Sequence, residues 1–491
     1  MSQNTNLVYQ PSDKPPLKKN LVYALQQLLA IMAATLLVPV LVDGNGLYMS
    51  QPAALYGAGF GTLFYLFMTQ RKSPVFLGSS FAFISPLVGA VAYGFAGIFL
   101  GAVFAGLVYI IIALVVKATG TAWVNKLLPP VVIGPTVALI GLSLCGSAIN
   151  NLANLNGDHA VLSIVEGFEG TINAENLKDA VSIGSWSGYS LIHILLGIFA
   201  FGMTVWASVK GGKGLKMIPF IIGIVSAYVV GLLLTLIGNA ANVDALKVVN
   251  LSAFDNLKII SAPRFTFLGI FGVYDDAIKE TVINGEAVGT VNKITSFSQV
   301  INLLVLFAPV AFVTLAEHIA DHKNLSSIIN RDLTQDPGLS RTLIGDGAGS
   351  IIGSFFGGCP NTTYGESVGC VAITGNASVS TIFIAAIYCI VLSFFGPFTA
   401  FVNSIPSCIT GGVCIALYGF IAVSGLKMLQ PVDLSDNRNL FVVAAILVCG
   451  IGGLTIKLGD VTISAIATAL ILGILVNVIF NKKPVEQEAK K

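Results

Sequence analysis

The sequence predicts an all-α polytopic membrane protein with fourteen transmembrane segments in two inverted repeats of seven. Three observations support this fold class: the chain is strongly apolar, its apolar residues fall into windows of membrane-spanning length, and motifs recur between its two halves. The mean hydropathy of the 491 residues is +0.85 and only 10% of them are charged, whereas soluble domains carry about 25% charged residues. A soluble globular fold is therefore excluded.

Eleven apolar windows are long enough to cross a bilayer, which takes about 17–25 residues in a helix. Three further windows, 75–92, 342–358 and 361–376, are shorter or broken by glycine and complete the fourteen segments. We expect short extended stretches in the third and tenth segments. The eleven long windows are 21–42, 51–69, 94–116, 129–149, 188–208, 217–238, 298–320, 378–402, 407–426, 437–456 and 461–480.

The charged residues indicate how the chain is oriented in the membrane. With the N-terminus inside, 19 of the 26 Lys and Arg residues fall in inside segments and 7 in outside segments. This bias fits the positive-inside rule, so residues 1–19 and 482–491 are predicted to be cytoplasmic tails of a multi-pass protein of the cell membrane. The first span is too long for a cleaved signal peptide.

Two long outer segments, 151–187 and 239–297, are acidic. Their acidic residues include Glu166, Glu169, Glu175, Asp275, Asp276 and Glu280. The second segment carries little apolar periodicity, so we expect a lightly folded loop there.

Two sets of residues recur at nearly the same offset, which indicates an internal repeat. After 278 residues, Gly134, Ala138, Leu139 and Gly141 are matched by Gly412, Ala416, Leu417 and Gly419. After 283 residues, Ser79-Ser80-Phe81-Ala82 is matched by Thr362-Thr363-Tyr364-Gly365, and the same offset places Ala34 opposite Glu317. If each half has seven spans, an odd number, the second half is inserted upside down, as in many secondary transporters.

Residues 358–376 are too polar and too rich in Gly and Pro for an ordinary span, although apolar segments flank them closely. Glu366 lies in their middle. An ionisable group at membrane depth costs roughly 2.5–3.5 kcal/mol and normally faces a cavity. Broken backbone survives at that depth only where protein or water covers it. Half-helix ends or extended stretches at 79–83 and 362–366 would direct free N–H groups at one point, which predicts a substrate site.

A second cluster of charge, residues 316–322, ends a long apolar run. On a helix, Glu317 and Asp321 share a face, while His318 and His322 form a second pair about 100° further around the helix axis. In an alternative interpretation, Asp321 and His322 only mark the cytoplasmic end of the span.

Other classes of function lack their motifs. The residues around His318 and His322 are in the wrong order for a zinc motif, and no phosphate-binding loop for ATP is present. The seven cysteines lie in apolar segments without metal-ligand spacing, so they are expected to be small core residues. An enzyme is not expected, because Glu317 and His318 are adjacent and point to different helix faces. A channel would show a repeated filter or a charged ring, and an anion exchanger would offer a cation at the site.

Two carboxylates, Glu317 and Glu366, would approach one cavity from opposite repeats. An ionised carboxylate only accepts hydrogen bonds and so suits the N–H groups of a ligand, while backbone N–H groups suit carbonyls. A flat molecule that alternates N–H and C=O, a pyrimidine or purine base, matches both, and Phe81 or Tyr364 would cover its face. Such a pair can also bind a proton together with a neutral ligand. No cofactor is expected besides the coupling proton.

Four motifs carry a resemblance to a known family: Gly-Ser-Ser-Phe-Ala-Phe-Ile-Ser-Pro (78–86), Ala-Glu-His-Ile (316–319), Arg-Asp-Leu-x-x-Asp-Pro-Gly-Leu (331–339) and Pro-Asn-Thr-Thr-Tyr-Gly-Glu (360–366). With these motifs the chain resembles the nucleobase/ascorbate transporter family, and within it the bacterial uracil permease branch. The resemblance runs from about residue 14 to residue 480. It implies proton-coupled uracil uptake by alternating access.

The resemblance also implies how the membrane domain, 20–481, is divided. Members of the family have a core domain and a gate domain and usually form homodimers through the gate. In this chain the core would comprise about 20–118 and 298–402, the gate about 127–238 and 407–481, and the outer loop 239–297.

Position by position, the resemblance implies two groups of functional residues. Those expected to bind the base are Glu317, Glu366, Phe81, Gly365, Tyr364, Ser80 and Tyr418. The two acids and the backbone groups of Phe81 and Gly365 would hydrogen-bond the base, Phe81 and Tyr364 would line the pocket, and Ser80 and Tyr418 match pocket-side or gating positions. Those expected to take part in proton coupling are Glu317, Asp321 and His318.

Several positions depart from the family pattern or leave alternatives open. Ser367 stands where Asn is common, Gly375 where Arg is frequent, and Asp321 where some uracil permeases carry His. Glu366 replaces the Gln common in purine branches, which argues against the alternative of a xanthine or uric acid carrier. Asp346, near the start of the ninth segment, is either a further coupling candidate or a helix cap.

Overall fold

The computed structural model describes residues 7–43, 47–153, 162–164, 181–183, 188–212, 214–255, 257–274, 282–283, 286–287, 294–458 and 461–480. The acidic residues expected in the outer segments and the tail 482–491 lie outside these ranges. Within them the chain is mostly helical, and seven helices are long and apolar enough to cross a membrane.

The first half begins with α1 (Leu17–Val42) and α2 (Gln51–Met68) and then breaks into a strand and short helices. In order, the further elements are β1 (Leu77–Ser79), η1 (Phe81–Phe83), α3 (Ile84–Val91), α4 (Gly94–Thr119), α5 (Ala122–Leu127), α6 (Pro130–Ser143), α7 (Cys145–Ala153), β2 (Leu162–Ile164), β3 (Val181–Ile183), α9 (Gly188–Val209), η2 (Leu215–Met217) and α10 (Pro219–Ala241).

Short elements connect the halves, and a long helix then opens the second half. The connecting elements are η3 (Asp244–Leu246), η4 (Leu251–Phe254), α11 (Thr266–Ile270), β4 (Val282–Ile283) and β5 (Glu286–Ala287). The second half comprises α13 (Phe297–Ile329), η5 (Thr334–Gly338), α14 (Leu339–Phe355), β6 (Asn361–Thr363), α15 (Gly365–Thr374), α16 (Val379–Ser393), α17 (Gly396–Asn403), α18 (Ser407–Lys427), α19 (Asn437–Ile451), β7 (Ile456–Leu458), β8 (Val461–Ile463) and α20 (Ala465–Ile479).

Most predicted windows coincide with a helix, but several differ. Window 378–402 is two helices, α16 and α17, because Pro397 stands at the N-terminus of α17 and cannot continue α16. Window 129–149 is likewise divided into α6 and α7. Helix α13 continues to Ile329, so Asp321 and His322 lie inside the helix and do not mark its C-terminus.

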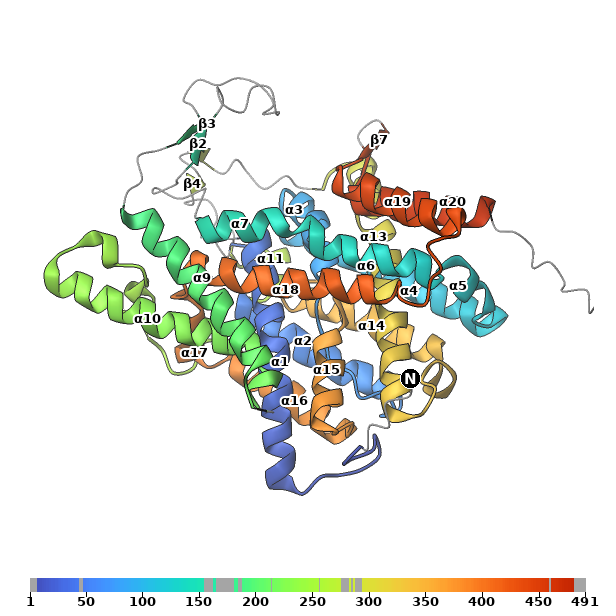
Figure 1. Cartoon of the computed structure of the whole chain (residues 1–491), viewed down its shortest axis with the longest axis horizontal. Helices are drawn as coiled ribbons and strands as arrows, with labels where there is room; N and C mark the ends of the chain where they lie inside the picture. The colour runs from blue at the N-terminus through green and yellow to red at the C-terminus, as the bar shows by residue number, and fades with distance from the viewer. Residues whose placement is uncertain are drawn as a thin grey trace, which may run out of the picture.

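Helices pack in two groups, which Figure 1 shows in different parts of the molecule. Helix α14 packs against α2 and α4, and α16 packs against α1 and α2. Helix α18 packs against α6, α7 and α9, and α19 packs against α20 and α6. In Figure 1, α6, α7, α18, α19 and α20 run across the upper part of the view, and α1, α14, α15 and α16 lie below them.

Small residues allow the closest helix contacts, as is common between membrane helices. A Cβ atom added to Gly57 of α2 would lie 2.5 Å from the carbonyl oxygen of Gly353 in α14. One added to Gly425 of α18 would lie 2.2 Å from the backbone nitrogen of Ala138 in α6. Neither pair of helices leaves space for a larger residue at these crossings.

Strands β1 and β6 pair in antiparallel fashion and join the two halves. Leu77 faces Thr363, Gly78 faces Thr362, and Ser79 faces Asn361. The side chain of Asn361 fixes this strand pair, which we call the β1–β6 crossing, between α2 and α14. Its Nδ2 donates to the carbonyl oxygens of Gly57 in α2 (3.3 Å) and Gly349 in α14 (3.2 Å).

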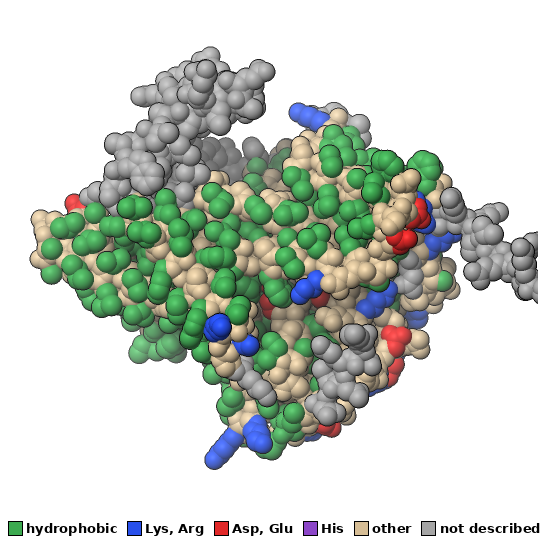
Figure 2. All heavy atoms as spheres, in the orientation of Figure 1, with side chains coloured by type: hydrophobic (Ala, Val, Ile, Leu, Met, Phe, Trp, Pro, Cys, Tyr) green, Lys and Arg blue, Asp and Glu red, His purple; other side chains and the backbone are tan. Residues whose placement is uncertain are grey.

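The outer surface matches a lipid environment. Figure 2 shows hydrophobic side chains covering much of one face, with several basic side chains toward its lower side. Exposed apolar residues include Val448 (70% exposed) on α19 and Leu233 (56%) on α10. Such exposure is normal for side chains that face acyl chains rather than water.

The described part of the outer loop is held against the helices, in contrast with the lightly folded loop expected there. The backbone N–H of Ser261 donates to Phe394 O (2.9 Å), and that of Gly396 donates to Ile259 O (3.0 Å). The ring of Phe265 lies 5.1 Å from that of Tyr56 on α2.

The cysteines follow the sequence prediction in part. Cys359, Cys370, Cys389, Cys408 and Cys414 are buried core residues, whereas Cys449 is half-buried and Cys145 is exposed. The prediction was therefore wrong for Cys145.

Candidate substrate site

The β1–β6 crossing leads directly into two helix N-termini. The extended backbone ends at Ser79 and Thr363, and helical backbone begins at Phe81 and Gly365. The first N–H groups of a helix have no intrahelical acceptor, and the helix dipole adds partial positive charge there. Both N-termini border the same cavity.

This cavity, which we call the acidic cavity, has a volume of about 60 Å³. It contains most of the residues that the sequence predicted for the site. Its lining consists of Ser80, Phe81, Val137, Glu317, Ala320, Asp321, Thr362, Tyr364, Gly365, Glu366, Phe420, Ile421, Ser424 and Met428. Side chains from β6, α13 and α15 thus face apolar side chains of α6 and α18.

Three acidic side chains line the cavity. Glu317 and Asp321 lie one helical turn apart on α13, so both reach the same side. Asp321 Oδ2 accepts a hydrogen bond from Thr363 Oγ1 at 2.9 Å, and Glu366 stands in the first turn of α15. Among the described lining residues there is no Lys, Arg or His. The cavity therefore suits a ligand that donates hydrogen bonds, not an anion.

One hydroxyl group at the cavity is available to a ligand. Ser80 Oγ is buried and has no hydrogen-bond partner among the described residues. Buried polar groups are normally paired, so an unpaired hydroxyl on a cavity wall marks a position where a bound molecule can donate or accept.

Tyr364 is fixed across the crossing. Its hydroxyl donates to the carbonyl oxygen of Ser79 at 2.7 Å and lies 3.4 Å from Thr35 Oγ1. Its backbone N–H donates to Phe76 O at 3.1 Å. The ring lies so close to Gly78 that an added Cβ would be 2.5 Å from its carbons. The ring is therefore held in place before any ligand binds.

Tyr418 lies behind the cavity wall instead of on it. Its ring packs edge-on against Phe81 at a centroid distance of 5.5 Å, and Tyr418 is absent from the cavity lining. It contacts the ligand site through Phe81.

His318 points away from the acidic cavity. Its Nδ1 lies 2.6 Å from Asp346 Oδ2, and its Nε2 lies 3.0 Å from Thr342 Oγ1. Asp346 is fully buried within α14, whose N-cap is Gly338. The interpretation of Asp346 as a helix cap is therefore wrong: its carboxylate pairs with a histidine of the neighbouring helix.

Sequence reasoning missed the apolar wall of the cavity. Val137 of α6, Phe420 and Ile421 of α18 and Met428, directly after α18, are the apolar residues across the cavity from the acids, and Ser424 lies among them. In the sequence these residues are ordinary members of a hydrophobic span, and no local signal distinguishes them from lipid-facing neighbours.

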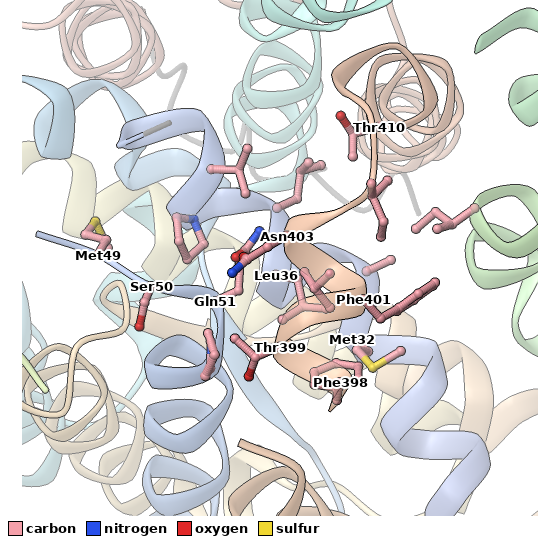
Figure 3. A pocket seen from close by; sticks show the side chains of 18 of the residues that line it. Met32, Leu36, Met49, Ser50, Gln51, Phe398, Thr399, Phe401, Asn403 and Thr410 are labelled. Atoms are coloured by element: carbon pink, nitrogen blue, oxygen red, sulfur yellow. The ribbon is translucent and has the colours of Figure 1, made fainter. Parts of the chain in front are cut away.

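A second cavity, about 630 Å³ in volume, is larger but has different chemistry. It is lined mainly by apolar residues of α1, α10, α17 and α18, with Gln51 and Asn403 among its polar residues (Figure 3). Its carboxylate, Asp43, already accepts backbone N–H groups from Tyr48 (2.6 Å) and Met49 (3.0 Å). The acidic cavity, with the unpaired hydroxyl of Ser80 and several acids, is therefore the better candidate for a polar substrate.

A strand crossing, two helix N-termini and buried acids between packed helices define a multi-pass membrane transporter with a broken-helix site. A family profile described as "Permease family" matches residues 18–459. The chain belongs to this permease family, as its resemblance to nucleobase/ascorbate transporters predicts.

Two curated relatives are similar over nearly the full chain. The uracil permease of Bacillus caldolyticus is 36% identical over 476 residues, which cover 96% of this chain and 94% of the relative. The uracil permease of Bacillus subtilis (strain 168) is 35% identical over 471 residues, covering 95% and 93%.

A solved structure supports the fold independently of sequence. The transmembrane domain of the cyanobacterial bicarbonate transporter BicA matches with a TM-score of 0.59 at 14% identity, covering 94% of this chain and 97% of that one. This likeness concerns the fold alone. Because one fold can serve different substrates, the substrate has to be inferred from the groups that line the cavity and not from the fold.

Proposed function

We propose that this permease is a uracil:proton symporter that works by alternating access. The observation that carries the proposal is the acidic cavity, where the carboxylates of Glu317 and Glu366 meet two helix N-termini. Its support is the high similarity to uracil permeases over nearly the whole chain. The protein is thus a carrier of a small neutral molecule.

The groups of the cavity complement a pyrimidine base. Carboxylates of Glu317 and Glu366 would accept the ring N–H groups. The backbone N–H groups of Phe81 and Gly365, at the two helix N-termini, would donate to the ring carbonyls. The rings of Phe81 and Tyr364 would pack against the face of the base, and Ser80 would add a hydroxyl at the rim.

Charge gives a reason for coupling to protons. Glu317, Asp321 and Glu366 line one cavity, where like charges would repel each other, and uracil brings no charge to offset this repulsion. Moving several charges through hydrocarbon is costly, so a proton on these carboxylates makes the loaded site easier to move. We assign the proton to Glu317 with Asp321, because both line the cavity. His318, which pairs with Asp346 elsewhere, is the weaker candidate.

The finer architecture belongs to the same proposal. The fourteen segments would form two inverted repeats, with the core and gate divided as the resemblance implies and both termini in the cytoplasm. The cavity lies between β6, α13 and α15 on one side and α6 and α18 on the other. A movement of the first group past the second would expose the base to either side of the membrane. Homodimers would form through the gate.

The test is uptake of radiolabelled uracil by purified protein in liposomes, with and without an inward proton gradient. Accumulation that depends on the gradient, and that unlabelled uracil but not xanthine inhibits, is the expected result. Uptake or inhibition by a purine alone would reassign the cavity to a xanthine or uric acid carrier. Equal uptake without a gradient would remove the proton from the mechanism. Competition by thymine, which is uracil with an added methyl group, tests how much space surrounds the pyrimidine ring.

A further inference from the structure

A chain of hydrogen bonds runs from α13 toward the basic side of the molecule without touching the acidic cavity. His322 Nε2 lies 2.7 Å from the hydroxyl of Tyr65 on α2. That hydroxyl lies 2.8 Å from Ser73 Oγ, in the segment after α2. All three side chains are fully buried.

The direction of each hydrogen bond follows from the chemistry of the groups. His322 Nδ1 lies 2.8 Å from the carbonyl oxygen of His318, which can only accept. Nδ1 therefore carries the hydrogen, and Nε2 of the neutral imidazole accepts from the Tyr65 hydroxyl. Since Tyr65 has one hydroxyl hydrogen, its oxygen accepts from Ser73. All the donors are thus aligned toward His322.

The chain runs from α13 toward a basic surface and ends at Ser73, which is itself buried directly beneath its sequence neighbours on that surface. His322 follows Asp321, a residue of the acidic cavity, while Ser73 follows Lys72, whose side chain is 36% exposed. Lys72 forms an ion pair with Asp336 at 2.6 Å, and Arg331 pairs with the same carboxylate. These basic residues belong to the side assigned to the cytoplasm.

The charged and titratable neighbours of His322 are few among the described residues. The ring of His318 stacks on it at 4.1 Å, and Tyr65 contacts it from α2. Asp346 of α14 pairs with His318, not with His322. No carboxylate among the described residues forms an ion pair with His322, so a proton on its ring has no anion to hold it there.

We propose that His322, Tyr65 and Ser73 form the cytoplasmic limb of the proton pathway, the last steps by which the coupling proton leaves the protein. In this limb the proton on Nε2 of an imidazolium His322 passes to Tyr65 Oη. The Tyr65 hydroxyl hydrogen passes at the same time to Ser73 Oγ, and the Ser73 hydrogen passes to cytoplasmic water. Each oxygen gains one O–H bond and loses one, and the end state is the neutral arrangement in the structure. This inference rests on the proposed symport function.

The test compares net transport with exchange in liposomes. Net uracil uptake driven by a proton gradient needs release of the proton inside, whereas exchange of labelled for unlabelled uracil does not. Tyr65→Phe removes the central hydroxyl and keeps the ring. We expect net uptake to fall at least tenfold, with uracil exchange and the dissociation constant for uracil within twofold of the parent protein. Tyr228→Phe is the matched control, because Tyr228 of α10 is also buried and its hydroxyl likewise pairs with a serine, Ser404, at 2.7 Å, outside the chain that starts at His322.

Three further variants keep the proposal falsifiable. Ser73→Ala interrupts the chain at its outer end and should lower net uptake selectively, and Ser73→Thr, which restores the hydroxyl, should recover it. His322→Gln should abolish net uptake and preserve exchange. Equal loss of exchange and net uptake in these variants would show a merely structural role, and unchanged net uptake would show that the proton leaves elsewhere. Either result overturns the proposal. Retained uracil binding and exchange in the parent protein separate these failures from failure of the proposed function itself.

Discussion

Two broken segments meet in this protein. Their backbone elements follow in the same order, but their side chains differ. In the first, β1 leads into η1 and α3; in the second, β6 leads into α15. An offset of 283 residues matches Phe81 with Tyr364 and Phe83 with Glu366. Phe83 is fully buried and stacks on Phe307 at 5.9 Å, whereas Glu366 faces the acidic cavity.

The helices that support the two segments differ in the same way. The offset matches Ala34 of α1 with Glu317 of α13, and Val38 with Asp321. Both residues of α1 are buried and apolar, and both residues of α13 are acids of the cavity. The common backbone therefore brings two helix N-termini together, while side chains of the second half alone supply the charge. The two segments thus share a backbone arrangement and differ in the side chains that they bring to the cavity.

Removing the carboxylate of the second segment should have the largest effect. Glu366→Ala is expected to abolish measurable uracil binding, because ligand N–H groups lose their acceptor in a dry pocket, at a cost of about 1–3 kcal/mol or more. Isothermal titration calorimetry in detergent measures the affinity. Phe83→Leu, at the matching position, is the control and should keep it. Unchanged affinity in a folded Glu366→Ala protein would sink the assignment.

The next largest effect separates proton coupling from uracil binding. Asp321→Asn should reduce gradient-driven accumulation at least about tenfold, because the amide cannot take up the proton, while the dissociation constant for uracil changes by less than about threefold. Asn can still accept the hydrogen bond from Thr363. Uptake assays in liposomes and equilibrium binding are compared on the same preparation. Equal losses would move Asp321 from coupling into the group that binds the base.

A smaller effect tests the close approach of the two segments. Gly78→Ala places a Cβ against the ring of Tyr364, 2.5 Å from its carbons, so the ring has to move from its place at the cavity. We expect uracil affinity to fall about tenfold, equivalent to about 1.4 kcal/mol. Gly369→Ala in α15 is the control, because nothing lies within 4 Å of its added Cβ. An unaffected Gly78→Ala protein would mean that the position of the Tyr364 ring is unimportant.

The smallest effect concerns the hydrogen bond that ties the second segment to the first. Tyr364→Phe removes the donor to Ser79 O, with an expected loss of about 0.5–1.5 kcal/mol of stability and a correspondingly lower melting temperature in detergent. Tyr388→Phe, whose hydroxyl makes only a 3.5 Å contact with Leu21 O at the surface, should melt like the parent protein. A Tyr364→Phe protein of unchanged stability would show that strand pairing alone holds the crossing.

Much of the candidate site was predictable because its residues are chemically conspicuous. Glu317, Asp321 and Glu366 are acids within apolar segments, and the matched hydroxyl–aromatic motifs pointed to Phe81 and Tyr364. All five line the acidic cavity. The helical spacing of α13 also separated the histidine pair from the acid pair correctly, since His318 and His322 stack on each other away from the cavity.

Other features depended on contacts that no local pattern encodes. The role of Asp346 was uncertain because a carboxylate in a helix has the same sequence signature whether it caps a terminus or pairs with a buried histidine. Its partner, His318, is on another helix, 28 residues away in the chain. Likewise, Phe420 and Met428 reach the acidic cavity only because α18 and the residue after it lie across the cavity from β6, α13 and α15.

The sequence by itself determined the membrane class, the position of most spans and the family, because hydropathy and motif identity are properties of neighbouring residues. Tertiary structure alone decided that residues about 280 positions apart form one β-ladder, that the acids face an apolar wall, and that His322 connects to Tyr65 and Ser73. The physical reason is that the free energy of placing a segment in the bilayer is a sum over the residues of that segment, so the local sequence decides it. Hydrogen-bond register and cavity shape depend on which backbones approach closely, and small residues such as Gly57 and Gly353 set that approach.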